Sequence, residues 1–226
     1  MKNSLTFKYF PLISGIVIVV AGAILAALYT YSLRADMSRI AERNNVSMAH
    51  AFANYVWPRI DSFVNDAHTM SIDHLTKHPK LGEIRGLALE LVRDTPILKI
   101  KIYDLTGLTV FSSDIAQIGE GKGKNAGFLA ARNGAVASEL THRDTFSAFE
   151  QQVEDRDVLS SYIPVRTKTG EIRGVFEIYY DVTQFLARIK FSQQLQIAVV
   201  ALTLALLYLM ILMLMRHRDR LIESHH

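Results

Sequence analysis

The sequence predicts an α+β protein in which an antiparallel sheet of about five strands follows a long helix, with a transmembrane helix on either side. Three observations lead to this fold class. Residues 98–114 read as two short strands around a turn, and residues 34–78 carry a helical apolar stripe. In addition, both ends of the chain contain an uncharged run long enough to cross a bilayer.

The sheet begins in residues 98–114, LKIKIYDLTGLTVFSSD. Apolar residues here alternate with Lys99, Lys101 and Tyr103, which is the period of a strand and not of a helix. The intervening Asp-Leu-Thr-Gly is typical of a hairpin turn. We expect an antiparallel meander with one helix, residues 128–132, after the second strand. The remaining strands are predicted at residues 135–143, 157–166 and 171–181.

Residues 34–78 predict a long amphipathic helix, and residues 81–94 predict a shorter one. Pro58 predicts a kink in the long helix. We expect its distal half to pack on the sheet. The half nearest the membrane is expected to pair with the same helix of a second chain, which predicts a homodimer. The apolar stripe consists of Met48, Phe52, Tyr55, Phe63, Ala67 and Met70.

Residues 9–33 and 195–215 contain no charged residue, and each run reaches the roughly 20 residues of a transmembrane helix. The first run is longer than the roughly 7 to 15 apolar residues of a signal peptide. Of the 25 basic and 22 acidic residues, five and two respectively lie outside these runs, which leaves 20 of each between them. The basic excess therefore lies at the membrane ends, as is typical of cytoplasmic flanks.

This pattern predicts that both termini are cytoplasmic and that the central domain lies outside the membrane. Because the central domain is neutral, the pI near 9.1 gives no reason to expect nucleic acid as a partner. The sequence has no cysteine, which excludes disulfides and thiol chemistry. The predicted parts are a cytoplasmic head (1–8), a first transmembrane helix (9–33), an extracytoplasmic domain (34–194), a second transmembrane helix (195–215) and a cytoplasmic stub (216–226).

Two motifs were weighed for chemistry. The glycine-rich segment 119–127 does not match a P-loop, because three residues instead of four separate Gly119 from Gly123 and an asparagine follows Lys124. His74 and His78 have a spacing that can serve a metal, but no third ligand follows at the spacing of a tetrahedral site. No Ser-His-Asp order or carboxylate pair stands out. We therefore expect no metal, no cofactor and no catalytic residue in this chain.

Residues 141–157 are predicted to form a long loop between the third and fourth strands, and such loops in compact domains are often functional. The chain resembles the PAS-like Cache domains found outside the membrane in bacterial signalling receptors. The resemblance lies in the order of elements and in the sequence segments KIYDLTGLTVFSSDIAQIGE and GEIRGVFEIYYDVT. The resemblance covers roughly residues 37–190. It is greatest to the inputs of membrane-bound diguanylate cyclases and sensor histidine kinases.

The resemblance implies a ligand between the sheet and the helix and loops that cover its outer face. Arg132 and Arg143 would pair with a carboxylate, and aromatic residues would form the walls. A small carboxylate or an amino acid is therefore the expected ligand. By position, the ligand-binding residues are Tyr103, Phe128, Arg132, Thr141, Arg143, Asp144 and Tyr162.

These observations lead to the expectation of a sensor in the bacterial inner membrane with a periplasmic domain, which relays ligand binding through the second transmembrane helix. Residues 216–226 contain neither a GGDEF nor a histidine-kinase signature. The catalytic output is therefore expected in a longer chain or a partner. The alternative is a doubly anchored protein-interaction or assembly module without a small-molecule ligand. A membrane hydrolase has no supporting motif.

Overall fold

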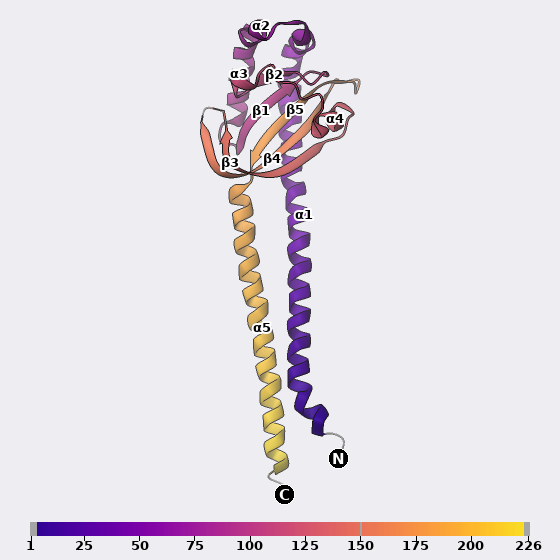
Figure 1. Ribbon diagram of the computed structural model, residues 1–226, viewed down its shortest axis with the longest axis vertical. Helices are drawn as coiled ribbons and strands as arrows, with labels where there is room; N and C mark the ends of the chain where they lie inside the picture. Colours follow the sequence, from indigo (N-terminus) through magenta and orange to yellow (C-terminus); the bar gives the residue numbers. More distant parts are fainter. Residues whose placement is uncertain (1–3, 150, 224–226) are drawn as a thin grey trace. The chain divides into compact units, whose positions relative to one another are not determined.

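The computed structural model describes residues 4–149 and 151–223 (Figure 1). The chain divides into two compact units. We call residues 4–37 and 187–223 the helical unit and Ser38–Leu186 the sheet unit. The first three residues of the predicted cytoplasmic head and the last three of the predicted stub lie outside the described residues.

The helical unit contains the first part of α1 (Ser4–Asp66) and most of α5 (Thr183–Glu223). Within the described residues, one stretch, Thr183–Leu214, is long and apolar enough to cross a membrane, and an 18-residue window in it has a mean hydropathy of 2.8. The first uncharged run contains a shorter apolar helix, Ile13–Tyr29. A second transmembrane helix therefore stays a prediction.

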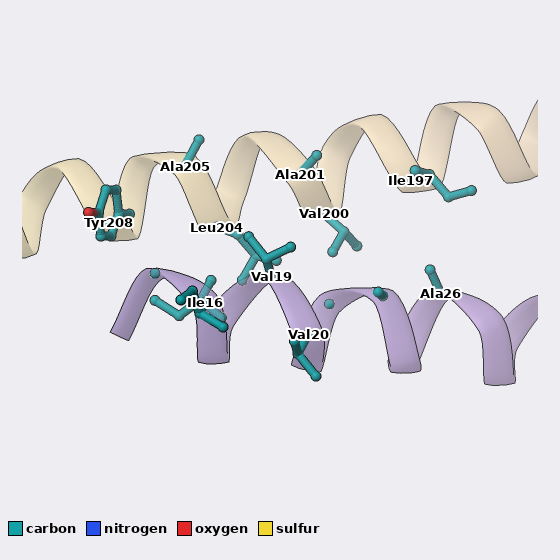
Figure 2. A pocket seen from close by; sticks show the side chains of 14 residues that line it. Ile16, Val19, Val20, Ala26, Ile197, Val200, Ala201, Leu204, Ala205 and Tyr208 are labelled. Atoms are coloured by element: carbon teal, nitrogen blue, oxygen red, sulfur yellow. The ribbon is translucent and has the colours of Figure 1, made fainter. Parts of the chain in front are cut away.

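The two helices of this unit border an apolar groove of about 640 Å³ (Figure 2). Glycines permit close approach of the helices: a Cβ atom at Gly22 would lie 2.6 Å from Cδ1 of Leu204, and one at Gly15 would lie 3.2 Å from the Tyr208 ring. Small residues at helix contacts are typical of helices that associate in lipid.

The sheet unit contains one antiparallel sheet with the strand order β2-β1-β5-β4-β3. The predicted meander is wrong, because β5 lies between β1 and β4. Burial agrees with the places of β1 and β3: β1 is buried along most of its length, whereas β3 is mostly exposed and forms an edge. β2 forms the other edge, although its four residues are buried. The strands are β1 (Ile97–Tyr103), β2 (Thr109–Ser112), β3 (Ala137–Ser147), β4 (Gln152–Arg166) and β5 (Ile172–Asp181).

The predicted loop at residues 141–157 is also wrong, because most of it forms the β3–β4 hairpin. Pairing extends from Ala137 opposite Tyr162 to Ser147 opposite Gln152. The outer part of β3, residues 141–147, is polar apart from Phe146. It therefore lacks the apolar alternation by which a half-buried strand is recognised in a sequence.

The predicted long helix continues through Pro58 but ends at Asp66, well before His78. Two side-chain caps account for the breaks that follow: Ser71 accepts the backbone N–H of His74, and His78 accepts that of Lys80. The remaining helices are η1 (Ala67–Thr69), α2 (Ile72–Thr76), α3 (Pro79–Val92), η2 (Ile115–Gln117) and α4 (Ala126–Arg132).

The main core lies between one face of the sheet and helices α1 and α3. On α1, the rings of Phe52 and Trp57 lie 5.4 Å and 5.9 Å from the ring of Phe176 on β5. Most of the predicted stripe faces this core, but Tyr55 is exposed, with the Arg59 guanidinium 4.5 Å from its ring. The sheet thus covers much of the surface that was expected to require a second chain. The homodimer itself stays a prediction.

A tight contact in this core gives a test of the fold. A Cβ atom at Gly174 would lie 2.5 Å from the Trp57 ring and 2.8 Å from the backbone oxygen of Tyr103. We expect Gly174→Ala to lower the free energy of unfolding by about 1–3 kcal/mol through overpacking. Urea unfolding of the detergent-solubilised chain, followed by the fluorescence of its single tryptophan, measures this change.

Gly86 on α3 is the matched control, because a Cβ atom there meets nothing within 4 Å. Gly86→Ala is expected to raise the free energy of unfolding by about 0.5–1 kcal/mol, the usual gain in a helix interior. Equal effects of the two substitutions would contradict the packing of Trp57 against β5.

Candidate functional site

The second face of the sheet carries buried ionisable side chains. Lys99 and Lys101 on β1 and Glu177 on β5 are only 3%, 2% and 2% exposed. Lys101 lies directly opposite Glu177 in the strand register. Because side chains alternate along a strand, the same register directs Ile100 and Ile102 into the main core. We call the surface around these three charged residues the charged face.

Tyrosines surround the Glu177 carboxylate. The Tyr103 hydroxyl donates a hydrogen bond to Oε2 of Glu177, and Tyr162 is the cross-strand neighbour of Glu177 on β4. Burial raises the pKa of Tyr103, Tyr162 and Tyr179, and the charge of Glu177 and hydrogen bonding to it raise these pKa values further. The phenols therefore stay protonated and serve as hydrogen-bond donors at physiological pH.

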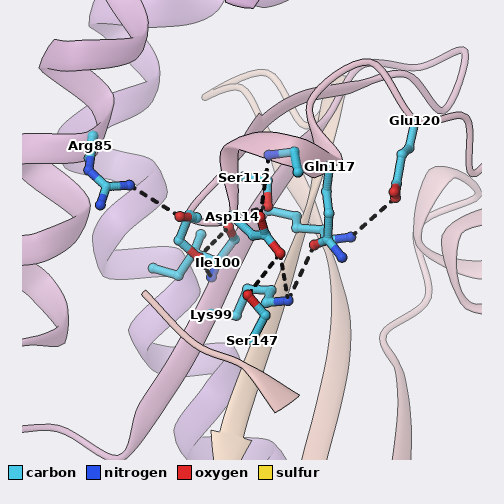
Figure 3. Close-up of polar contacts among 11 residues, drawn as sticks. Arg85, Lys99, Ile100, Ser112, Asp114, Gln117, Glu120 and Ser147 are labelled. Atoms are coloured by element: carbon cyan, nitrogen blue, oxygen red, sulfur yellow. Dashed lines mark hydrogen bonds and ion pairs between the residues drawn. The ribbon is translucent and has the colours of Figure 1, made fainter. Parts of the chain in front are cut away.

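The ammonium groups of the two lysines contact side chains of the loop that follows β2 (Figure 3). Nζ of Lys99 lies 3.9 Å from Oδ2 of Asp114 and 3.3 Å from Oε1 of Gln117. Nζ of Lys101 lies 3.7 Å from Oε2 of Glu120. Burial costs each ammonium group its hydration. This lowers the pKa of Lys99 to about 8 and also lowers the pKa of Lys101.

The β3–β4 hairpin also reaches this site. Nζ of Lys99 lies 4.5 Å from the centre of the Phe146 ring, which itself packs against Tyr179 at 5.2 Å. The Ser147 hydroxyl donates to Oδ2 of Asp114 at 2.8 Å. The Lys99 ammonium group on β1 thus contacts both the η2 segment and the end of β3.

Helix α4 covers the other end of the charged face. The Phe128 ring lies 5.8 Å from Tyr103, and the Tyr103 and Tyr162 rings stack at 6.3 Å. Gly127 permits this contact, since a Cβ atom there would lie 2.4 Å from the Tyr162 ring. Asn125 begins the helix by accepting the backbone N–H of Phe128. The buried members of this small cluster are Tyr103, Phe128, Ala131, Tyr162 and Val175.

The structure brings some of the predicted ligand-binding residues together and separates others. Tyr103, Phe128 and Tyr162 share the cluster under α4. Thr141 is half-buried on β3, whereas Arg132 and Asp144 point outward. Arg143 is exposed, but its charge opposes the rise in the pKa of Tyr179 and so acts at the rim of the charged face. Their role in binding a ligand stays a prediction.

The sequence interpretation missed Lys99, Lys101, Glu177 and Tyr179 as site residues. The signal was present in the strand period, because lysine and tyrosine alternate with isoleucine along β1. It was overlooked because charged residues on one face of a strand usually point into solvent.

The described residues contain no group of three or more histidine, cysteine or acidic side chains suited to a metal ion. The His74 and His78 rings lie 5.9 Å apart. The His78 ring packs 4.6 Å from Phe63, and its Nδ1 caps α3. His78 therefore has a structural role in this arrangement.

No family model and no curated protein sequence matches the chain. Among solved structures, the sensor domain of DcuS from E. coli has a TM-score of 0.41 and 18% identity, covering 68% of this chain and 98% of that one. The sensor domain of the histidine kinase DctB from V. cholerae has a TM-score of 0.36 and 14% identity, covering 65% of this chain and 58% of that one. The periplasmic domain of RsbU from Chlamydia trachomatis has a TM-score of 0.34 and 15% identity, covering 71% and 58%.

Two of these structural neighbours are sensor domains and the third is a periplasmic domain. The sheet unit has an antiparallel sheet packed on a long helix, which is the arrangement that the resemblance of the sequence to PAS-like Cache domains implies.

The low pKa of Lys99 predicts a specific pH dependence. In the unfolded chain this lysine keeps its proton up to about pH 10.5, whereas in the folded chain it loses the proton near pH 8. Between these values the unfolded state binds more protons, so the free energy of unfolding rises with pH. Each pKa unit corresponds to about 1.4 kcal/mol, so deprotonation of Lys99 contributes up to about 3 kcal/mol to the rise in the free energy of unfolding. Lys99→Met should remove this contribution.

Urea unfolding of wild type and Lys99→Met at pH 7, 8.5 and 10 measures this effect. The variant should be the more stable protein at pH 7 and should lose its advantage toward pH 10, because only the wild type gains from deprotonation of Lys99. Parallel pH profiles would show that Lys99 is not desolvated in the folded protein.

Proposed function

We propose that this chain is the input module of a bacterial transmembrane signalling receptor and that it binds a small carboxylate or amino acid at the charged face. The observation that carries the proposal is the burial of two lysines and one glutamate on a single sheet face. Buried charges are costly unless they are paired, and they concentrate at functional sites. The main core does not need them, because it lies on the opposite face.

The charged face has the chemistry to recognise such a ligand. A carboxylate entering near Lys99 and Lys101 would replace the long ion pairs with Asp114 and Glu120, at 3.9 Å and 3.7 Å, by shorter charge-assisted hydrogen bonds. Glu177 and its tyrosines offer the complementary acceptor and donor groups for an amino acid. Arg143 at the rim would add positive charge at the entrance.

Hydrogen bonds inside the sheet unit support a route from this face to α5. β5 ends at Asp181, whose side chain accepts the backbone N–H of Thr183 at the start of α5. The Thr183 hydroxyl accepts a hydrogen bond from the backbone N–H of Asp157, and the backbone N–H of Val182 donates to the backbone oxygen of Asp157. A shift of β5 around Glu177 would therefore move the first turn of α5.

From that turn, α5 continues into the stretch that is apolar enough to cross a membrane. In our proposal the sheet unit lies in the periplasm and both termini lie in the cytoplasm, with the chain anchored twice in the inner membrane and acting as a homodimer. The receiving output would be a diguanylate cyclase or histidine kinase, in the same polypeptide or a partner. The basic flanks of the two uncharged runs support this orientation.

A melting screen tests ligand binding. The full chain in nanodiscs is heated with a panel of organic acids and amino acids. A true ligand at a hundredfold excess over its Kd should stabilise the wild type by about 2.7 kcal/mol. Lys101→Met should lose most of this gain, because it removes a buried partner of the carboxylate.

Lys168→Met is the matched control, since Lys168 is exposed in the turn between β4 and β5. It should keep the full ligand-induced stabilisation. A ligand that stabilises wild type and Lys101→Met equally would place binding away from the charged face. A panel without any stabilising compound would favour the alternative, a membrane-anchored protein-interaction module.

A further inference from the structure

A second cavity lies on the opposite side of the η2 segment from the charged face. It has a volume of about 210 Å³ and lies between α2, the start of α3, the end of β2 and η2. This is room for roughly seven water molecules at about 30 Å³ each, less than a drug-sized ligand requires. Its lining residues are Thr76, Lys77, His78, Leu81, Gly82, Arg85, Phe111, Ser112, Ile115 and Ile118.

The lining divides into an apolar part and a basic part. Four side chains are large and apolar: Leu81, Phe111, Ile115 and Ile118. The charged members of the lining are Lys77 and Arg85, beside the imidazole of His78, and no acidic side chain belongs to the described lining. Lys77 is paired with Asp73 at 2.6 Å on the exposed surface. This combination suits a small molecule with one negative charge and an apolar tail.

Arg85 is held in a defined position beside the cavity (Figure 3). Its Nη1 donates to the backbone oxygen of Ser113 at 3.1 Å, and its Nη2 donates to that of Phe149 at 3.4 Å. Preorganisation of this kind lowers the entropic cost of binding an anion. Arg85 therefore presents a fixed positive charge to a ligand between α3 and β2.

We propose that this cavity is a second ligand site, distinct from the charged face, and that it binds a short-chain monocarboxylate. The carboxylate would lie at Arg85, Lys77 and His78, and the alkyl chain would lie against Leu81, Phe111 and Ile118.

The two sites share the η2 segment. Ile115 and Ile118 line the cavity, while Asp114 and Gln117 contact the Lys99 ammonium on the charged face. A molecule in the cavity therefore touches the segment that holds Lys99. This gives the second site a direct structural connection to the first.

Gly82 offers a clean way to close the cavity. It lies in the lining, and a Cβ atom there meets nothing within 4 Å. Gly82→Leu would add a side chain at the lining, where a Cβ atom has open space, and would replace a helix-destabilising glycine on α3. Gly86→Leu, one turn further along α3, is the matched control, because Gly86 has equal space and lies outside the described lining.

The test uses butyrate as the probe. Saturation-transfer NMR titrations are made on the full chain in nanodiscs, with empty nanodiscs as the blank. Wild type and Gly86→Leu should bind butyrate with equal Kd, and Gly82→Leu should bind at least tenfold more weakly. Butylamine, which has the same chain and the opposite charge, should not bind. Lys168→Met should bind butyrate as wild type does, because Lys168 is exposed and lies outside the described lining. Lys99→Met is measured beside it to detect binding at the charged face.

Three results would each overturn the proposal. The first is equal butyrate binding by wild type and Gly82→Leu. The second is binding of butylamine as tight as that of butyrate. The third is the absence of saturable butyrate binding to wild type. Loss of binding in Lys99→Met with full binding in Gly82→Leu would assign butyrate to the charged face, which would support the proposed function and refute the second site.

Discussion

The arrangement of the sheet unit depends on the burial of two ammonium groups and a carboxylate on the central strands of one sheet. Lys99, Lys101 and Glu177 can be buried there only if each charge keeps a partner. Tyr103 supplies one for the glutamate, and the segment after β2 supplies Asp114 and Glu120 for the lysines. The position of that segment over the sheet follows from this requirement, since it carries two of these three partners, Asp114 and Glu120.

The two faces of the sheet therefore have different physical roles. The face against α1 and α3 is apolar and closely packed, and Gly174 lets the Trp57 ring approach the β5 backbone. Such a core provides stability and a rigid support. The charged face gains little stability from its ion pairs, because desolvation offsets much of the attraction within a buried pair. In our proposal, a ligand replaces the long contacts of these lysines with Asp114 and Glu120.

Much of the fold could be predicted from the sequence, because strand and helix periods are local properties. The fold class was predicted from three local features: the alternation in β1, the helical apolar stripe of α1 and the PAS-like sequence of β5. The same features distinguished the strands from the long helix. The sheet order could not be predicted, since the pairing of β1 with β5 depends on burial of residues far apart in the chain. The β3–β4 hairpin was read as a loop because its polar sequence carries no strand signal.

The candidate site was predicted only in part for the same reason. Tyr103, Phe128 and Tyr162, which the resemblance to Cache domains placed by position in one ligand-binding region, share a cluster in the structure. Lys101 and Glu177 lie opposite each other only once β5 pairs with β1, so no local pattern reveals them as a pair. The arginines were carried over by position from the resemblance, and the structure places Arg132 on the surface.

The central claim is that the charged face is where a ligand binds. The most direct measurement is NMR of the lysine side chains in the full chain in nanodiscs, with the Lys99 and Lys101 signals assigned through Lys99→Met and Lys101→Met. Addition of a stabilising carboxylate is predicted to shift these two signals and to leave that of the exposed Lys168 unchanged. Unchanged Lys99 and Lys101 signals at saturating ligand would contradict the account.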